Sequence, residues 1–185
     1  SPEVRHTTDA VFGDIDGDGD LDVVVSNEGD ENQVYINQVG AQGGKFEDFT
    51  INTLPGGSKV TQALALGDVD GDGDLDLAIA NGTDIATGRN QLLLNQGGVQ
   101  GGVTGQFIAQ NLPGSSGFSR DAAFADVDGD GDLDLIFTFY AFYPIPAPNR
   151  LYINQGGAQG GIPGSFTAPI NLPGLVTPGD KSSRG

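Results

Sequence analysis

The stretch that decides the fold is Asp14-Ile15-Asp16-Gly17-Asp18-Gly19-Asp20-Leu21-Asp22, an acidic segment that recurs at 68–76 and 126–134. We call the three copies loops 1, 2 and 3. Loops 2 and 3 are identical, and loop 1 differs only by an isoleucine at its second position, where the others have valine. The copies begin 54 and then 58 residues apart. This spacing indicates a chain of internal repeats.

The negative charge of the chain is concentrated in these loops. The 185 residues include 25 acidic and 8 basic side chains, for a formal net charge of −17, and each loop holds five of the acids. Carboxylates at this density repel one another unless a cation neutralises them. The overall charge excludes nucleic acid as a partner, because phosphates would be repelled. No stretch approaches the ~20 apolar residues that span a bilayer, so we expect no membrane insertion.

The similarity between repeats extends beyond the loops. An apolar run precedes each loop, a second follows it, and a third begins at Asn32, Asn90 or Asn149. A glycine-rich turn then leads to a fourth short segment, which we assign to Phe46, Phe107 and Phe166, and each repeat closes with Leu-Pro-Gly at Leu54, Leu112 or Leu172. Four strand-length runs per repeat predict a four-stranded antiparallel sheet. The runs beside the loop suit buried inner strands, and the later ones suit exposed outer strands.

The predicted fold is therefore all-β, with three tandem four-stranded antiparallel blades of β-propeller type. The expected units are 1–57, 58–116 and 117–175, followed by a polar tail at 176–185. Closed propellers have about four to eight blades, so three are too few to close alone. Two apolar faces would stay open. We expect either further copies of the chain, assembled as a ring or filament, or the rest of a longer chain to cover them.

The pattern of the loop predicts a metal site. Alternate aspartates at positions one, three and five can converge on one centre, and the intervening glycines allow the backbone to curl around an ion. We expect position seven to offer its backbone carbonyl, position nine to close the shell with its carboxylate, and Leu21 to anchor the loop in the core. The predicted ligands are Asp14, Asp16, Asp18, Asp20, Asp22, Asp68, Asp70, Asp72, Asp74, Asp76, Asp126, Asp128, Asp130, Asp132 and Asp134.

Calcium is the metal that these oxygen ligands favour, and we expect three Ca²⁺ ions, one per repeat. Magnesium is a weaker candidate because it prefers a compact octahedron and keeps its waters. The lack of nearby histidine or cysteine argues against zinc and copper. An EF-hand would need a glutamate at position twelve, where this chain has Val25, Ile79 and Phe137. An acidic turn without an ion is the remaining alternative.

The loop between two apolar strands, repeated at blade spacing, resembles the FG-GAP and VCBS repeats, a family that includes the integrin α-subunit propeller. Phe12-Gly13 matches the first half of the FG-GAP signature, and residues 149–154 resemble the strand after the calcium hairpin in VCBS repeats. The Gly-Ala-Pro half of the signature is missing. The resemblance implies calcium in a hairpin between two strands of each blade. It also implies a range of roles that includes adhesion, carbohydrate binding and surface scaffolding.

We interpret the chain as a non-enzymatic structural or adhesive protein of the extracellular space or cell surface, where calcium is plentiful. The single histidine, His6, lies in a polar segment, and no acid pair stands apart from the loops. One alternative is a carbohydrate-binding, lectin-like module that holds its ligand between blades near the glycine-rich turns or on the aromatic residues of 137–143. Another is an accessory domain of a larger secreted enzyme. A glycan or protein ligand is compatible with any of these readings.

Overall fold

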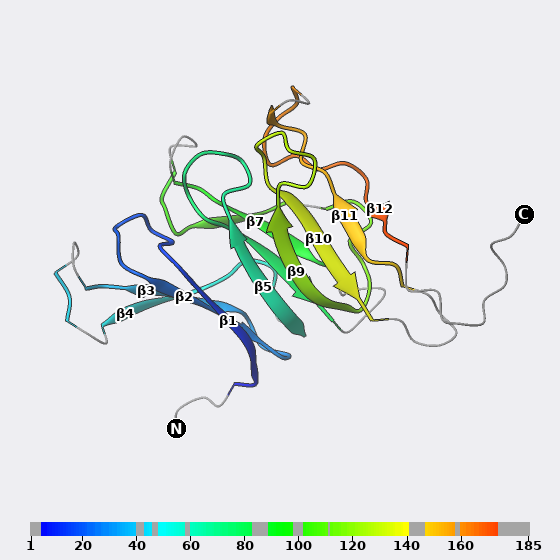
Figure 1. Ribbon diagram of the computed structural model, residues 1–185. Helices are drawn as coiled ribbons and strands as arrows, with labels where there is room; N and C mark the ends of the chain where they lie inside the picture. Colours follow the sequence, from blue (N-terminus) through cyan, green and yellow to red (C-terminus); the bar gives the residue numbers. More distant parts are fainter. Residues whose placement is uncertain are drawn as a thin grey trace, which may run out of the picture.

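Three separate antiparallel sheets form the computed structural model, which describes residues 5–39, 43–45, 48–57, 60–82, 89–97, 102–110, 112–140, 147–157 and 160–173 (Figure 1). Blade 1 consists of β1 (Thr7–Gly13), β2 (Asp22–Asn27), β3 (Gln33–Asn37) and β4 (Phe49–Thr53). Blade 2 consists of β5 (Thr61–Gly67), β6 (Asp76–Asn81), β7 (Gln91–Asn95) and β8 (Phe107–Gln110). Blade 3 consists of β9 (Ser119–Ala125), β10 (Asp134–Phe139), β11 (Arg150–Tyr152) and β12 (Ile170–Asn171).

In each blade the strands pair in chain order, and no sheet closes on itself within the described residues. The predicted all-β class with three four-stranded antiparallel blades is therefore confirmed. The unit boundaries at 57, 116 and 175 stay a prediction, and the tail at 176–185 lies outside the described residues. None of the described segments forms a helix long and apolar enough to cross a membrane.

Blade 2 lies between the other two blades (Figure 1). Its first strand, β5, contacts β1 on one side and β9 on the other, so the three first strands lie next to one another at the inner edge. The predicted gradient from buried inner strands to exposed outer strands holds where both faces of a blade are covered. In blade 2 every residue of β6 is buried, whereas the outer strand β8 is partly buried at its two ends and exposed at its two middle residues.

The core consists of two clusters, one at each junction between blades. On β6, Leu77 and Ile79 belong to the cluster shared with blade 1, whereas the alternate residues Ala78 and Ala80 belong to the cluster shared with blade 3. This division follows from the two-residue period of a strand, which points successive side chains to opposite faces. The small alanine face leaves room for large aromatic residues from blade 3, including the fully buried Phe137. Complementary volumes thus fill each junction.

The fourth strand of blade 1 begins at Phe49, so the prediction that Phe46 marks this strand is wrong. Phe49 pairs with Asn37 in the same way that Phe107 pairs with Asn95, and an isolated bridge joins Phe166 to Asn154. Phe46 itself lies outside the described residues. The pattern was misleading because Phe46 is the first phenylalanine after the glycine-rich turn, whereas the position is fixed by pairing across the sheet.

Candidate metal centre

Each acidic loop curls back on itself between the first two strands of its blade. Gly17 and Gly19 have φ angles of 76° and 95°, in the left-handed region that residues with a Cβ seldom adopt. The matching glycines have φ angles of 75° and 98° in loop 2 and of 80° and 99° in loop 3. The predicted role of these glycines in the curl is confirmed.

The first-position aspartate holds the curl by accepting backbone hydrogen bonds. Asp68 accepts bonds from three N–H groups of loop 2, at 2.8, 3.1 and 3.0 Å. Asp126 accepts the same three bonds in loop 3. In loop 1, Asp14 Oδ2 accepts a bond from the N–H of Gly19 at 3.0 Å. Each of these carboxylates is therefore tied to the backbone of its own loop.

The buried ninth-position aspartate ties the loop to the third strand of its blade. Asp22 Oδ2 accepts the N–H of Ile15 at 2.7 Å, and its Oδ1 accepts the N–H of Asn37 at 2.7 Å. The equivalent bonds join Asp76 to Val69 and Asn95, and Asp134 to Val127 and Asn154. Each carboxylate oxygen has a second lone pair, so these bonds leave it able to face a cation.

The fifth- and seventh-position aspartates leave oxygens unsatisfied inside every loop. Oδ1 of the fifth residue accepts the N–H of the seventh at 2.9, 2.8 and 2.9 Å in loops 1, 2 and 3. The Oδ2 atoms of both residues are buried and have no hydrogen-bond partner among the described residues: Asp18, Asp20, Asp72, Asp74, Asp130 and Asp132. A buried carboxylate oxygen without a partner is costly, and a bound cation removes that cost.

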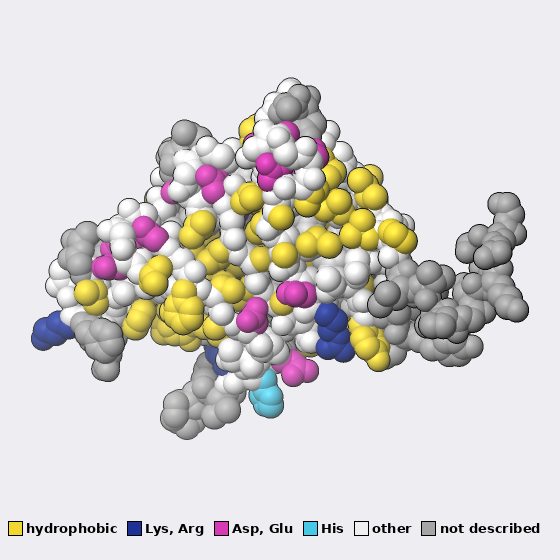
Figure 2. Space-filling view, in the orientation of Figure 1, with side chains coloured by type: hydrophobic (Ala, Val, Ile, Leu, Met, Phe, Trp, Pro, Cys, Tyr) yellow, Lys and Arg dark blue, Asp and Glu magenta, His cyan; other side chains and the backbone are white. Residues whose placement is uncertain are grey.

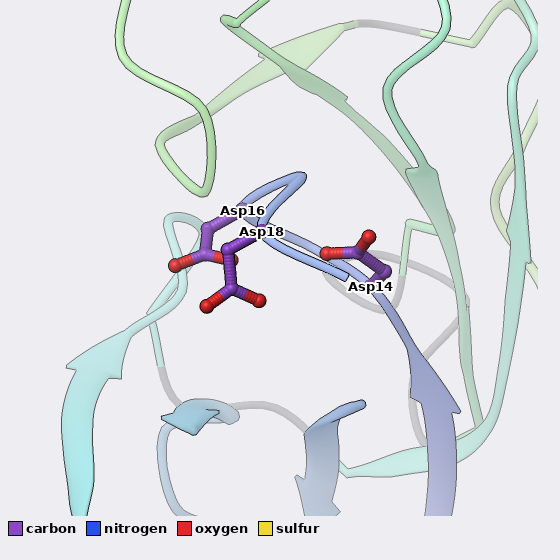
Figure 3. Close-up of side chains that lie close together, drawn as sticks. All are labelled: Asp14, Asp16 and Asp18. Atoms are coloured by element: carbon purple, nitrogen blue, oxygen red, sulfur yellow. The ribbon is translucent and has the colours of Figure 1, made fainter. Parts of the chain in front are cut away.

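Three carboxylates converge in each loop. In loop 1, Asp14, Asp16 and Asp18 each offer an oxygen within 4.8 Å of the others, and Figure 3 shows Asp16 and Asp18 side by side, with Asp14 across from them. The corresponding triads are Asp68, Asp70 and Asp76 in loop 2, and Asp126, Asp128 and Asp134 in loop 3. The first and third positions contribute to every triad. The predicted fifth position joins them only in loop 1, and in loops 2 and 3 the ninth position takes its place.

Without a cation, some carboxylates of each loop resist ionisation. Burial, followed by the negative charges of Asp72 and Asp68, raises the pKa of Asp70 to about 6. Burial also raises the pKa of Asp76 to about 7, although backbone hydrogen bonds oppose the shift. Burial is again the largest cause of the raised pKa values of Asp16, Asp22 and Asp74. Local desolvation, followed by the negative charge of Asp130, also raises the pKa values of Asp128 and Asp132. A bound divalent ion would favour the ionised form of these groups.

The donor set fits calcium better than other common metals. All the converging atoms are carboxylate oxygens, the hard ligands that calcium takes in flexible numbers of about six to eight. The predicted ligands outside the triads lie in the same loops: Asp20, Asp22, Asp72, Asp74, Asp130 and Asp132. The sequence assigned the seventh position only a carbonyl, yet its side chain also lies in the loop with a buried, unpartnered oxygen. The full ligand set stays a prediction.

The second residue of a loop reaches into the next blade, a role that the sequence reasoning missed. Ile15 and Val69 are fully buried, in the clusters that join blades 1 and 2 and blades 2 and 3. Asn95 Nδ2 donates to the Ile15 carbonyl at 2.8 Å, and Asn154 Nδ2 donates to the Val69 carbonyl at 2.7 Å. The asparagine that recurs at or just beyond the end of each third strand was the available signal. Loops 1 and 2 are thus parts of the junctions.

The eighth-position leucine faces the preceding blade, so the prediction that Leu21 anchors loop 1 in the core is wrong. Leu75 and Leu133 pack partly buried against blades 1 and 2 respectively. Leu75 approaches so closely that a Cβ added to Gly13 would lie 2.6 Å from its Cδ1. Leu21 is 63% exposed, because no described sheet covers that side of blade 1.

Fold and site together define a class: a repeat protein built from β-propeller-type blades with an aspartate-rich, metal-compatible loop in each first hairpin. A comparison with protein-family models agrees with this class. The model described as FG-GAP-like repeat matches residues 14–79 and 79–137, which together contain all three loops. The chain therefore belongs to the FG-GAP-like repeat family. A search of curated proteins finds no match.

Proposed function

We propose that this chain is a calcium-binding structural or adhesive module of the extracellular space or cell surface. Three calcium ions stabilise the hairpins of its blades, and the open blade faces mediate assembly with further copies. The observation that carries the calcium proposal is the set of buried, unpartnered aspartate oxygens that recurs at the fifth and seventh positions of every loop. Hydrogen bonds within the loops hold these oxygens in place, and a calcium ion would supply the missing charge and contacts.

Each ion would act through structure rather than through a reaction. The ninth aspartate connects the loop to the third strand, and the second residue connects loops 1 and 2 to the next blade. An ion that neutralises the loop therefore removes repulsion at a point where the hairpin, the blade and the junction meet. The extracellular location is inferred from the modest affinity that calcium modules show where the ion is abundant.

The aromatic segment 137–143 gives the carbohydrate-binding alternative little support. Phe137 is fully buried and packs edge-to-face on Tyr152, with ring centroids 6.0 Å apart. Phe139 is also buried, and the Arg150 guanidinium covers its ring at 4.3 Å. Residues 141–143 lie outside the described residues. Phe137 and Phe139 thus serve the core, whereas Tyr140 is 46% exposed and lies under the Arg120 guanidinium, 5.0 Å from the ring centroid.

Thermal unfolding with and without calcium tests the proposed function. We expect the melting temperature to fall by several degrees when a chelator replaces millimolar calcium, because ions that bind only the folded chain stabilise it by mass action. Magnesium at the same concentration is the control and should restore little of the loss. Equal melting temperatures in calcium, magnesium and chelator would contradict the proposal.

A further inference from the structure

The junction between blades 2 and 3 is built from two distinct faces. The leading face of blade 2 presents Val69, and the receiving face of blade 3 presents Phe124, Leu133 and the donor Asn154. Gly67 allows the faces to approach, since a Cβ there would lie 2.9 Å from Phe124 Cδ2 and 3.0 Å from Leu133 Cδ1. We use the names leading face and receiving face for the same positions in every blade.

The receiving face of blade 1 has almost the same side chains as that of blade 3. The strand pairings align Ala10 with Ala122, Phe12 with Phe124, Leu21 with Leu133, Tyr35 with Tyr152 and Asn37 with Asn154. In blade 3 these residues cover blade 2. In blade 1 they face outward, and Phe12 is 66% exposed. Asn37 Nδ2 donates only to Leu21 of its own blade, at 3.3 Å, and reaches no other described blade.

The leading face of blade 3 is open in the complementary way. Val127 occupies the position of Val69 in an identical loop, yet it is 54% exposed whereas Val69 is 2% exposed. Ala123 and Ala125 beside it are also exposed. Figure 2 shows hydrophobic side chains at the surface over strands of both outer blades. The open face of blade 3 thus has the side chains of a leading face, and the open face of blade 1 has those of a receiving face.

The Leu-Pro-Gly segments are also covered at the internal junctions and open on blade 3. Leu54 and Leu112 are buried in the two junction clusters. Beside the second of these leucines, Arg150 Nη1 donates to the Gly114 carbonyl at 2.7 Å, which fixes the segment on blade 3. Leu172, the equivalent residue of blade 3, is only partly buried. It therefore lacks the cover that a following blade gives to the other two.

Blade 1 has a hollow where such a segment would lie. The hollow measures about 580 Å³ and is lined by Gln33, Val25, Tyr35 and Ile51, among others. Gln33 aligns with Arg150, because each pairs with the matching residue of the second strand. The side chain that holds a Leu-Pro-Gly segment in the internal junction therefore has its counterpart in the wall of this hollow.

We propose that a second copy of this chain docks head to tail, with Val127 and Leu172 of one copy against the receiving face of blade 1 of the other. The proposal rests on the proposed function and names the partner and surfaces of its assembly. The contact is heterologous, so it either closes or propagates. Two copies would supply six blades, within the range of about four to eight that closed propellers use.

One position makes this contact weaker than the internal junctions. Ala125 stands where Gly67 allows close approach, so its methyl group displaces the incoming phenylalanine. Replacing Ala125 by glycine should therefore strengthen the association.

Sedimentation velocity of the full chain in millimolar calcium and 0.15 M salt measures the contact. We expect concentration-dependent association that Val127→Ser weakens at least tenfold. Val103→Ser is the matched control, because Val103 is 58% exposed but lies on blade 2, whose two faces are covered. It should leave association unchanged. If both the natural chain and Ala125→Gly sediment with the mass of a single copy at chain concentrations up to about 1 mM, the proposal is overturned.

Mixing two defective variants sharpens the test. Val127→Ser keeps its receiving face and Phe12→Ser keeps its leading face, so an equal mixture regains one intact contact per pair. We expect the mixture to associate more strongly than either variant alone, and the absence of any gain would overturn the head-to-tail arrangement. Calcium titration of the same samples separates the two proposals. Normal calcium binding without association contradicts docking alone, whereas absent calcium binding contradicts the proposed function.

Discussion

Loops 2 and 3 have the same nine residues but different surroundings. Loop 2 lies in a junction, where its valine is buried, and burial raises the pKa of Asp70 to about 6 and that of Asp76 to about 7. Loop 3 lies on an open face, where Val127 is exposed and the first and third aspartates are exposed as well. The sequence therefore specifies the ligands, whereas the next blade determines how costly it is to keep them charged.

The comparison predicts opposite effects of one substitution in two solutions. With free calcium at 100 times the dissociation constant, Asp70→Ala should lower stability by about 2.7 kcal/mol through the loss of one ion. In chelator it should instead raise stability, because a buried carboxylate with a raised pKa is removed. Asp128→Ala should also lose an ion but gain less in chelator, since its loop is exposed. Thermal unfolding in both solutions checks this. Equal gains in stability for the two variants in chelator would contradict the difference between loops 2 and 3.

A methyl group added at the junction should act differently from one removed at the open face. Gly67→Ala forces Phe124 and Leu133 to move, which should cost about 1–3 kcal/mol. Ala125→Gly, at the same position of blade 3, should cost less than about 1 kcal/mol, the effect of glycine in a strand. Urea unfolding of the dilute chain measures both. Equal costs would show that the junction does not constrain Gly67.

The asparagine at or just beyond the end of the third strand should contribute more to the free energy of unfolding where its side chain bonds to another blade. Asn154→Ala removes the bond to the Val69 carbonyl and leaves that buried acceptor unsatisfied, at a cost of about 1–3 kcal/mol. Asn37→Ala removes a 3.3 Å bond to the Leu21 carbonyl and a 3.2 Å bond from the Val39 N–H, both within its own blade, and should cost about 1 kcal/mol less. Chemical denaturation checks the difference. A larger effect at Asn37 would contradict the assigned role.

The raised pKa values in loop 2 also predict a pH dependence of the chelated chain. The folded pKa values of Asp70 and Asp76, about 6 and about 7, lie above the ordinary value of 3.8. The folded chain therefore binds more protons than the unfolded chain between these values, and stability should fall as pH rises from about 4 to 7. Asp70→Ala should reduce this slope and Asp128→Ala should reduce it less. Melting temperatures measured across this range would decide, and a rise in stability with pH would contradict the assignment.

Local patterns predicted most of the fold and the composition of the site. Short apolar runs gave the strands, and the interleaved aspartates and glycines gave the curled loops, because both depend on neighbours in sequence. The errors at Leu21 and Phe46 have one cause. Where Leu21 points depends on a preceding blade, and the place of the fourth strand depends on pairing with β3. The junction role of Asn95 and Asn154 was missed because the atoms they contact are about 80 residues away in sequence.

The central claim is that each acidic loop holds one calcium ion, and calorimetric titration of calcium into the chelator-treated chain tests it most directly. We expect three ions per chain, and two per chain for each of Asp16→Ala, Asp70→Ala and Asp128→Ala. A heat signal that saturates at three ions in the natural chain and falls by one in each variant would support the claim. No binding at millimolar calcium, or binding that these variants leave unchanged, would contradict it.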